Sequence, residues 1–159
     1  MGDPKQSRSR IESPLKAWDS KRIERENALL KEFGLRRKQE LRRAESILRG
    51  LRRQARELGA SKDERQQKQL LARVSRLNLM KESGGLDDVL GLSVNDVLSR
   101  RLQTIIHRKG IANTLKQSRQ LITHGHVVVG NRRIVWPSFL VSKDLEEQIK
   151  IKGVEVQKK

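Results

Sequence analysis

The sequence contains no cysteine and no tyrosine, and only two tryptophans and two phenylalanines among its 159 residues. The lack of cysteine excludes disulfide bonds, thiolate zinc sites and cysteine nucleophiles. With so few aromatic residues, a core must be built from aliphatic side chains. The chain also lacks an apolar run near the ~20 residues that span a membrane, and its start has no signal-peptide pattern. We therefore expect a soluble, intracellular protein.

Acidic residues are missing from one long segment. The chain has 36 Lys+Arg against 19 Asp+Glu, a net charge of +17. Residues 97–143 hold nine of the basic residues, all three histidines and no carboxylate. A surface of one sign attracts phosphate and speeds association with a polyanion. Residues 1–96 mix both signs, which is typical of a solvated helical surface. The acid-free segment thus predicts a nucleic-acid partner.

The first half of the chain shows helical periodicity. We expect residues 1–18 to form a disordered basic extension, followed by a helix that Asp19 or Ser20 caps and Gly34 ends. From Leu41 to Leu58 the apolar positions alternate steps of three and four, the spacing of one helical stripe, which Gly59 closes. A capping box of Ser61 with Glu64 then predicts a third helix, with Leu70, Val74 and Leu77 on one stripe, that Gly84-Gly85 breaks. The Asp87-Asp88 pair falls in a turn-like segment. These stripes indicate an intramolecular core rather than a coiled coil.

The second half begins with helices and ends with strands. Capping boxes at Ser93 with Asp96 and at Thr114 with Gln117 predict helices that end at Gly110 and Gly125. The period then changes to that of a β-hairpin over 127–135, with further strands at 139–141 and 149–151. The predicted fold class is α+β, with a helical region (19–92) followed by a small helix-helix-β-hairpin module with C-terminal strands (93–159).

Candidate binding residues come from both regions. Lys116, Arg119, Gln120 and Thr123 share the polar face of a short helix, and we expect Arg119 to have no local carboxylate partner. Arginine suits RNA because its planar fork binds phosphate and stacks on unpaired bases. Further candidates in the module are Arg100, Arg101, Arg108, Lys109, His124, His126, Arg132 and Arg133. Those in the helical region are Arg42, Arg43, Arg49, Arg52, Arg53 and Arg56.

Two alternatives for individual residues stay open. Arg108 and Lys109 at a helix C-terminus could simply offset the helix dipole. His124 and His126 are expected to hydrogen-bond RNA or backbone groups at a helix-to-strand corner. We expect no metal site and no cofactor, because the chain has no cysteine and only one further histidine, His107. No catalytic residues are predicted, since the sequence has neither a phosphate-cradling glycine loop nor a GxSxG motif.

The strings Arg100–Ile105, Arg108–Ala112, Arg119–Ile122, His124–Val127 and Pro137–Phe139 follow one another in a specific order. Together they resemble the RNA-binding module of small-subunit ribosomal protein S-four in its archaeal and eukaryotic form. The resemblance covers about residues 94–142. It implies a structural protein, not an enzyme, that binds small-subunit rRNA directly and nucleates assembly. It also implies a place beside protein S-five, where the messenger enters, and a supporting role in translational accuracy. The alternative is a freestanding RNA-binding factor that acts on stalled or aberrant ribosomal particles.

Overall fold

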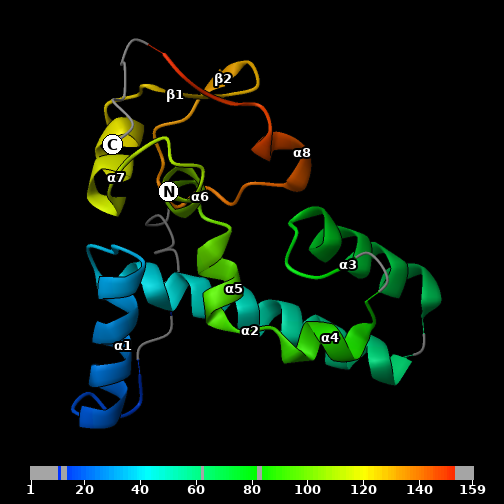
Figure 1. Cartoon of the computed structure of the whole chain (residues 1–159). Coiled ribbons are helices and arrows are strands. Elements are labelled where there is room, and N and C mark those ends of the chain that lie inside the picture. The colour runs from blue at the N-terminus through cyan, green and yellow to red at the C-terminus, as the bar shows by residue number, and fades with distance from the viewer. Residues whose placement is uncertain (1–10, 12–13, 62, 82–83, 153–159) are drawn as a thin grey trace, which may run out of the picture.

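The computed structural model describes residues 11, 14–61, 63–81 and 84–152, so most of the predicted basic extension lies outside it. The described chain is mostly helical with a small antiparallel sheet near its C-terminal end, which confirms the α+β class (Figure 1). The elements are α1 (Ser20–Glu32), α2 (Lys38–Ser61), α3 (Glu64–Arg76), α4 (Leu86–Gly91), α5 (Val94–Ser99), α6 (Leu102–Arg108), α7 (Leu115–Thr123), β1 (Val127–Val129), β2 (Arg132–Arg133), α8 (Lys143–Glu146) and β3 (Ile149–Ile151).

Helix α2 is the central rod of the N-terminal part. Helix α1 lies against one end of it, whereas α3, α4 and α5 pack along the rest (Figure 1). The predicted apolar stripe is confirmed, because Leu41, Leu48, Leu51 and Ala55 are all buried. They form one hydrophobic cluster with side chains of the neighbouring helices, including Val74 of α3. Burial of this stripe, rather than helix propensity, fixes how the helices pack.

Two helix ends differ from their predictions. Asp19 caps α1 as expected, with its side chain accepting from the backbone N–H of residue 22. Helix α2, however, runs through Gly59 to Ser61, and the predicted capping box of Ser61 with Glu64 is wrong. Asp63 caps α3 instead, because its carboxylate accepts two backbone N–H groups of the first turn, whereas the Ser61 hydroxyl donates back to the Leu58 carbonyl. One carboxylate thus satisfies two helix-end donors.

The segment predicted as one helix over 93–110 is two helices. The capping box of Ser93 with Asp96 is confirmed at the start of α5. The helix is interrupted at Arg100–Arg101. There the Leu102 N–H donates to the Phe139 carbonyl, and the Arg100 carbonyl accepts from the N–H of residue 141. These long-range backbone bonds replace intrahelical ones.

Two further predictions about elements fail. Residues 139–141 form only an isolated bridge between Arg101 and Leu140, not a strand, because the break at α5–α6 offers them a single pairing position. The turn-like segment around Asp87 is helix α4, because the Asp88 carboxylate accepts from the Gly85 backbone N–H and caps it. Helix α8, which lies in the chain between residue 141 and β3, was not predicted.

The C-terminal part places α6 and α7 beside each other against a sheet of order β2-β1-β3 (Figure 1). The predicted hairpin is confirmed, with Val128 opposite Arg133 and with Gly130 at a positive φ of 60° in the turn. The predicted strand at 149–151 is confirmed as β3. Residues 102–149 contribute a second hydrophobic cluster, so the core changes between Leu98 and Leu102. The domain boundary predicted at 92–93 stays a prediction.

Candidate nucleic-acid interface

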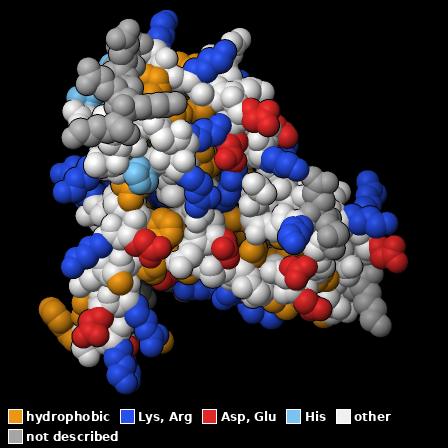
Figure 2. All heavy atoms as spheres, viewed as in Figure 1, with side chains coloured by type: hydrophobic (Ala, Val, Ile, Leu, Met, Phe, Trp, Pro, Cys, Tyr) orange, Lys and Arg blue, Asp and Glu red, His pale blue; other side chains and the backbone are white. Residues whose placement is uncertain are grey.

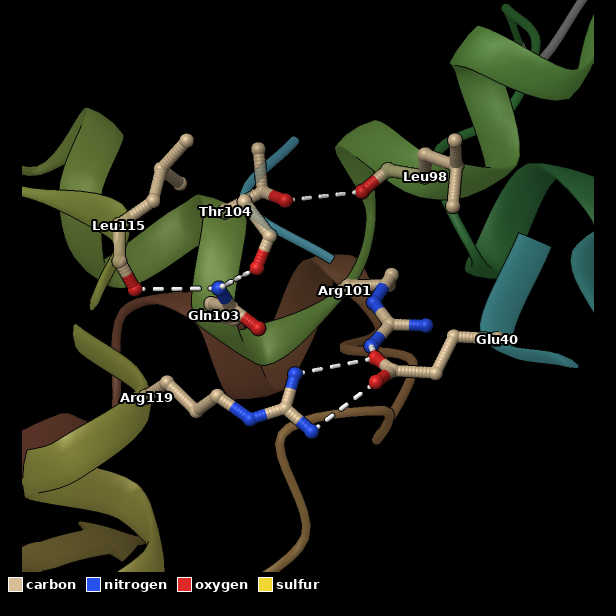
Figure 3. A network of polar contacts seen from close by, with 8 residues as sticks. Glu40, Leu98, Arg101, Gln103, Thr104, Leu115 and Arg119 are labelled. Carbon is tan, nitrogen blue, oxygen red and sulfur yellow. Dashed lines mark hydrogen bonds and ion pairs between the residues drawn. The ribbon is translucent and has the colours of Figure 1, made fainter. Parts of the chain in front are cut away.

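A three-residue ion-pair network joins the two parts of the molecule (Figure 3). Glu40, at the start of α2, accepts from Arg101 at the α5–α6 break, with 2.5 Å between Nη2 and Oε2. The same carboxylate accepts two bonds from Arg119 of α7, at 2.9 Å to Oε1 and 3.2 Å to Oε2. One carboxylate of the helical part therefore holds two arginines of the module in place.

The network stays charged at neutral pH. Burial raises the pKa of Glu40, but the hydrogen bond from Arg119 and the charges of Arg101 and Arg119 outweigh it and hold that pKa below its usual range. Burial lowers the pKa of Arg101, whose exposed fraction is 4%, and the charge of Glu40 opposes that shift. A buried guanidinium needs such a counter-charge to remain ionised. Arg101 and Glu40 thus depend on each other.

A buried glutamine reinforces the same junction (Figure 3). The Gln103 side chain donates to the carbonyls of Gly34 and Leu115, both at 3.0 Å. It links the end of α1 to the start of α7. Gly34 is required here, because its φ is +58° and a β-carbon would lie 2.7 Å from that of Leu115. The predicted glycine stop after α1 is therefore also a close contact between the two parts.

Two neighbouring grooves lie on the surface of this junction. The first, about 310 Å³, is lined by Arg37, Arg43 and Pro137 among others, and the second, about 530 Å³, by Lys31 and Lys116 among others. Arg36 and Arg119 line both grooves, so the two form one basic surface that crosses from the helical part to the module. We call this surface, made of Lys31, Arg36, Arg37, Arg43, Lys116 and Arg119, the junction surface.

Three predicted binding residues occupy places that the sequence did not indicate. Arg100 and Arg101 were expected on the surface, but they are 5% and 4% exposed. Arg100 donates to the Glu146 carboxylate at 2.7 Å and to a backbone carbonyl. Arg119 was expected to have no local carboxylate partner; in the structure it pairs with a distant one, Glu40, which lies 79 residues away along the chain. The contact of these three arginines with RNA stays a prediction. In the structure, Arg100 and Arg101 stabilise the fold through buried ion pairs.

The other predicted residues of α6 and α7 lie mostly at the surface. Lys116, Gln120 and Thr123 are exposed, as are Arg108, the last residue of α6, and Lys109, which follows it. The Thr123 hydroxyl donates to backbone carbonyls of its own helix, and the Lys109 ammonium donates to the backbone carbonyl of residue 146. Lys116 has no ion-pair partner in the part of the chain that the structure describes. It is therefore the cation of α7 that is freest to meet a phosphate.

At the histidine corner, the His126 imidazole has a backbone contact, one of the two options that we expected, and His124 takes part through its backbone carbonyl. His124 and His126 flank Gly125, whose φ is +76°, and their rings are nearly parallel with centroids 6.5 Å apart. The Nδ1 atom of His126 lies 3.3 Å from the Lys152 carbonyl, and Arg133 donates to the His124 carbonyl at 3.0 Å. These bonds tie α7 to both outer strands. Arg132 and Arg133 remain exposed on β2.

The predicted arginines of α2 divide by their exposure. The exposed ones are Arg43, Arg49, Arg53 and Arg56, and the half-buried ones are Arg42 and Arg52. Arg52 donates to the Leu92 carbonyl, which attaches α2 to the chain between α4 and α5. Arg53 pairs with Glu57 one turn along the helix. Only Arg43 of this set lines the junction grooves.

Sequence reasoning missed Lys31, Arg36 and Arg37. The signal was present, because Arg36, Arg37 and Lys38 follow the Gly34 stop directly and a basic run beside a chain reversal is available to a ligand. In Figure 2, Lys and Arg are spread over the whole face shown, with Asp and Glu between them, and the visible His lie at its upper left.

Within the described ranges, no cluster of three or more His, Cys, Asp or Glu residues is arranged to hold a metal ion. The described part of the chain also contains no helix that is both long and apolar enough to cross a lipid bilayer.

Comparison with known proteins identifies the class. A family model described as "S4 domain" matches residues 100–146, the segment from α6 to α8 with the preceding break. Residues 100–146 are therefore an S4 domain, in which two helices pack against the small sheet.

Comparison over the whole chain identifies the family. The chain is 45% identical over 155 residues to the small ribosomal subunit protein uS4 of Picrophilus torridus, which covers 94% of this chain and 85% of that protein. It is 44% identical over 153 residues to the proteins of that name from Metallosphaera sedula and Saccharolobus solfataricus, with coverage of 94% of this chain and 84–85% of theirs. The chain belongs to the uS4 family, and the resemblance seen in the sequence is confirmed.

Proposed function

We propose that this chain is a structural component of the small ribosomal subunit that binds small-subunit rRNA directly. Membership of the uS4 family supports the assignment to the ribosome. The net charge of +17 supports an RNA partner, because rRNA supplies the counter-charge that the isolated chain lacks. No reaction is part of the proposal, since the chain offers its RNA partner charge and shape rather than a nucleophile or a base.

The observation that carries the proposal is the junction surface. Five of its six cations are exposed, and the sixth, Arg119, is held by Glu40 with its side chain 26% exposed. The surface spans α1, α2 and α7, so one RNA segment that binds there touches both parts of the molecule. Folded RNA is recognised mainly through its shape and backbone, and a broad basic surface suits this better than a single helix in a groove.

The finer role follows from the family resemblance and is part of the proposal. An early binder of a multi-helix rRNA junction would nucleate assembly of the cytoplasmic small subunit. It would then remain beside protein S-five, where the messenger enters, and support translational accuracy. The rigid link between helical part and module through Glu40 favours such a task, because two RNA elements bound on the two parts are then held in one relative orientation.

The test is binding of the full chain to a small-subunit rRNA fragment that contains a multi-helix junction. The double variant Arg36→Ala, Lys116→Ala removes two cations of the junction surface, and Arg65→Ala removes an exposed cation of α3 as a matched control. With six to nine phosphates contacted, log affinity should fall with log salt with a slope of about −0.7 to −0.9 per phosphate. We expect the double variant to bind more weakly and with a slope smaller by about two, and the control to be unchanged. A flat salt dependence, or equal binding by all three proteins, would contradict the proposal.

A sucrose-gradient profile separates the ribosomal protein from the freestanding factor. A structural component should be present at one copy per small subunit under all growth conditions. Partial occupancy that rises only under stress would favour a factor for stalled or aberrant particles.

A further inference from the structure

Trp136 lies exposed on the surface of the module. Its exposed fraction is 64%, and that of the adjacent Val135 is 37%, just beyond β2. The module core does not need this indole, because Ile122, Val127 and Val141 fill it and are fully buried. Among the described residues no aromatic ring stacks on Trp136. A large aromatic side chain that is exposed to solvent, in a chain with so few aromatic residues, indicates that a ligand stacks on the face of its ring.

Trp136 borders a cavity of about 720 Å³ between the hairpin and α8. Phe139 lines it with an apolar face, whereas Asn131, Arg132 and Gln148 line it with polar groups. This cavity shares no residue with the junction grooves. Its combination of one flat aromatic, an apolar wall and amide donors and acceptors matches a nucleobase, which has a flat face and hydrogen-bonding edges.

The charges around the cavity favour an anionic occupant. Arg132 and Arg133 are exposed along β2. On the opposite side, the Glu146 carboxylate of α8 is engaged by Arg100 at 2.7 Å. Glu147, which follows α8, is exposed and, in the described part of the chain, has no ion-pair partner. Two exposed guanidinium groups thus outweigh one free carboxylate, which suits RNA better than an apolar protein segment.

We propose that Trp136 stacks on an unpaired base of RNA while Arg132 and Arg133 contact the flanking phosphates. The inference rests on the proposed RNA-binding function and adds a second site to it, with a preference for single-stranded over paired RNA. The preference has a physical reason: bases in a duplex already stack on each other and expose no face to a side chain. Stacking tolerates any base, so the site selects unpaired geometry rather than sequence.

The experiment uses the full chain with Trp18→Phe, so that Trp136 is the only tryptophan. The probes are an eight-nucleotide oligoadenylate and an eight-base-pair RNA duplex. We expect oligoadenylate to quench Trp136 emission and the duplex to quench it far less. In fluorescence-polarisation binding, Trp136→Ala should weaken the oligoadenylate complex about 5- to 100-fold. Trp136→Phe should retain most of the affinity, and Val135→Ala should match the parent.

Each result decides the inference. Unchanged emission, equal quenching by both probes, or equal oligoadenylate affinity for Trp136→Ala and the parent would overturn the stacking site. If the stacking site is overturned but the chain still binds the rRNA fragment, the proposed function stands without the stacking site. Loss of all RNA binding by the parent protein would overturn both the stacking site and the proposed function. Full retention of affinity by Trp136→Leu would also overturn it, because leucine supplies apolar area without a flat ring. Thermal melts of all variants should coincide, since the side chain is exposed.

Discussion

The helical part and the module neutralise their arginines in different ways. In the helical part, Arg22 pairs with Glu26 and Arg53 with Glu57, each one helical turn apart. Pairs between elements are also present there, because Glu26 also pairs with Lys38 of α2 and Arg76 of α3 pairs with Asp144 of α8. The module has no carboxylate from residue 97 to 143. Its buried arginines therefore take carboxylates from distant segments, and Arg101 reaches 61 residues back to Glu40.

This difference teaches how a strongly basic chain folds before it meets RNA. An exposed local pair such as Arg53 with Glu57 contributes little and constrains nothing beyond its own helix. A long-range pair with a buried arginine costs more to break and fixes two parts of the molecule relative to each other. Glu40 thus has a larger structural role than its exposed neighbours, although the sequence gives it no special mark.

The largest effect should come from the two cores. Ile122→Ala empties a fully buried position in the module, and Leu48→Ala does so in the helical part. We expect each to lower the free energy of unfolding by about 2–5 kcal/mol. Because the Glu40 network joins the parts, both variants should shift one cooperative urea transition followed by circular dichroism. Ile47→Ala, at the exposed neighbouring position, is the control. Two separate transitions would show that the parts unfold independently.

The next effect tests the long-range pair against a local one. Glu40→Gln removes the counter-charge of a buried arginine, and we expect a loss of about 2–4 kcal/mol in urea unfolding. Glu57→Gln breaks the exposed pair with Arg53 and should cost about 0.3–0.5 kcal/mol. Equal losses for the two variants would remove the distinction between local and long-range pairs.

The same carboxylate should make part of the stability depend on pH. Because the folded-state pKa of Glu40 is lowered, its contribution is present above the unfolded-state pKa of about 4.3 and is lost as pH falls through the folded-state value. The difference in unfolding free energy between the parent and Glu40→Gln should therefore be constant from pH 7 to about 5 and shrink below about pH 4. Urea titrations at these pH values measure it. A difference that grows on acidification would contradict the assignment.

The smallest effect on stability separates two cations of α7. Arg119→Ala loses the bonds to Glu40 and should cost about 1 kcal/mol, while Lys116→Ala, at an exposed position, should stay within about 0.5 kcal/mol. Both should weaken binding to the rRNA fragment. Arg119→Lys keeps the charge but loses the two-pronged geometry, so it should recover only part of the stability. Filter binding and thermal melts check each variant, and an unchanged melt for Arg119→Ala would show that its pair with Glu40 is negligible.

Much of the architecture could be read from local patterns. The stripe from Leu41 to Leu58, the Ser93 capping box and the Gly130-Asn131 hairpin depend on neighbours within a few residues, and each was predicted correctly. The break at Arg100–Arg101 could not be predicted in this way, because its hydrogen-bond partners come from residues 139–141. The capping of α3 by Asp63 was missed for a different reason, since two acceptable caps lie two residues apart and only one is used.

For the candidate site, too, some features follow from the sequence and others only from the tertiary structure. Sequence alone determined that this chain is a basic α+β protein with an acid-free segment, because composition, periodicity and motif order are properties of the chain itself. Only the tertiary structure decided that Arg101 and Arg119 form ion pairs with Glu40 and that Arg36 lines the same grooves as Arg119. Ion pairs depend on distance in space, and a charge 79 positions away along the chain has no signature in the spacing around Arg119.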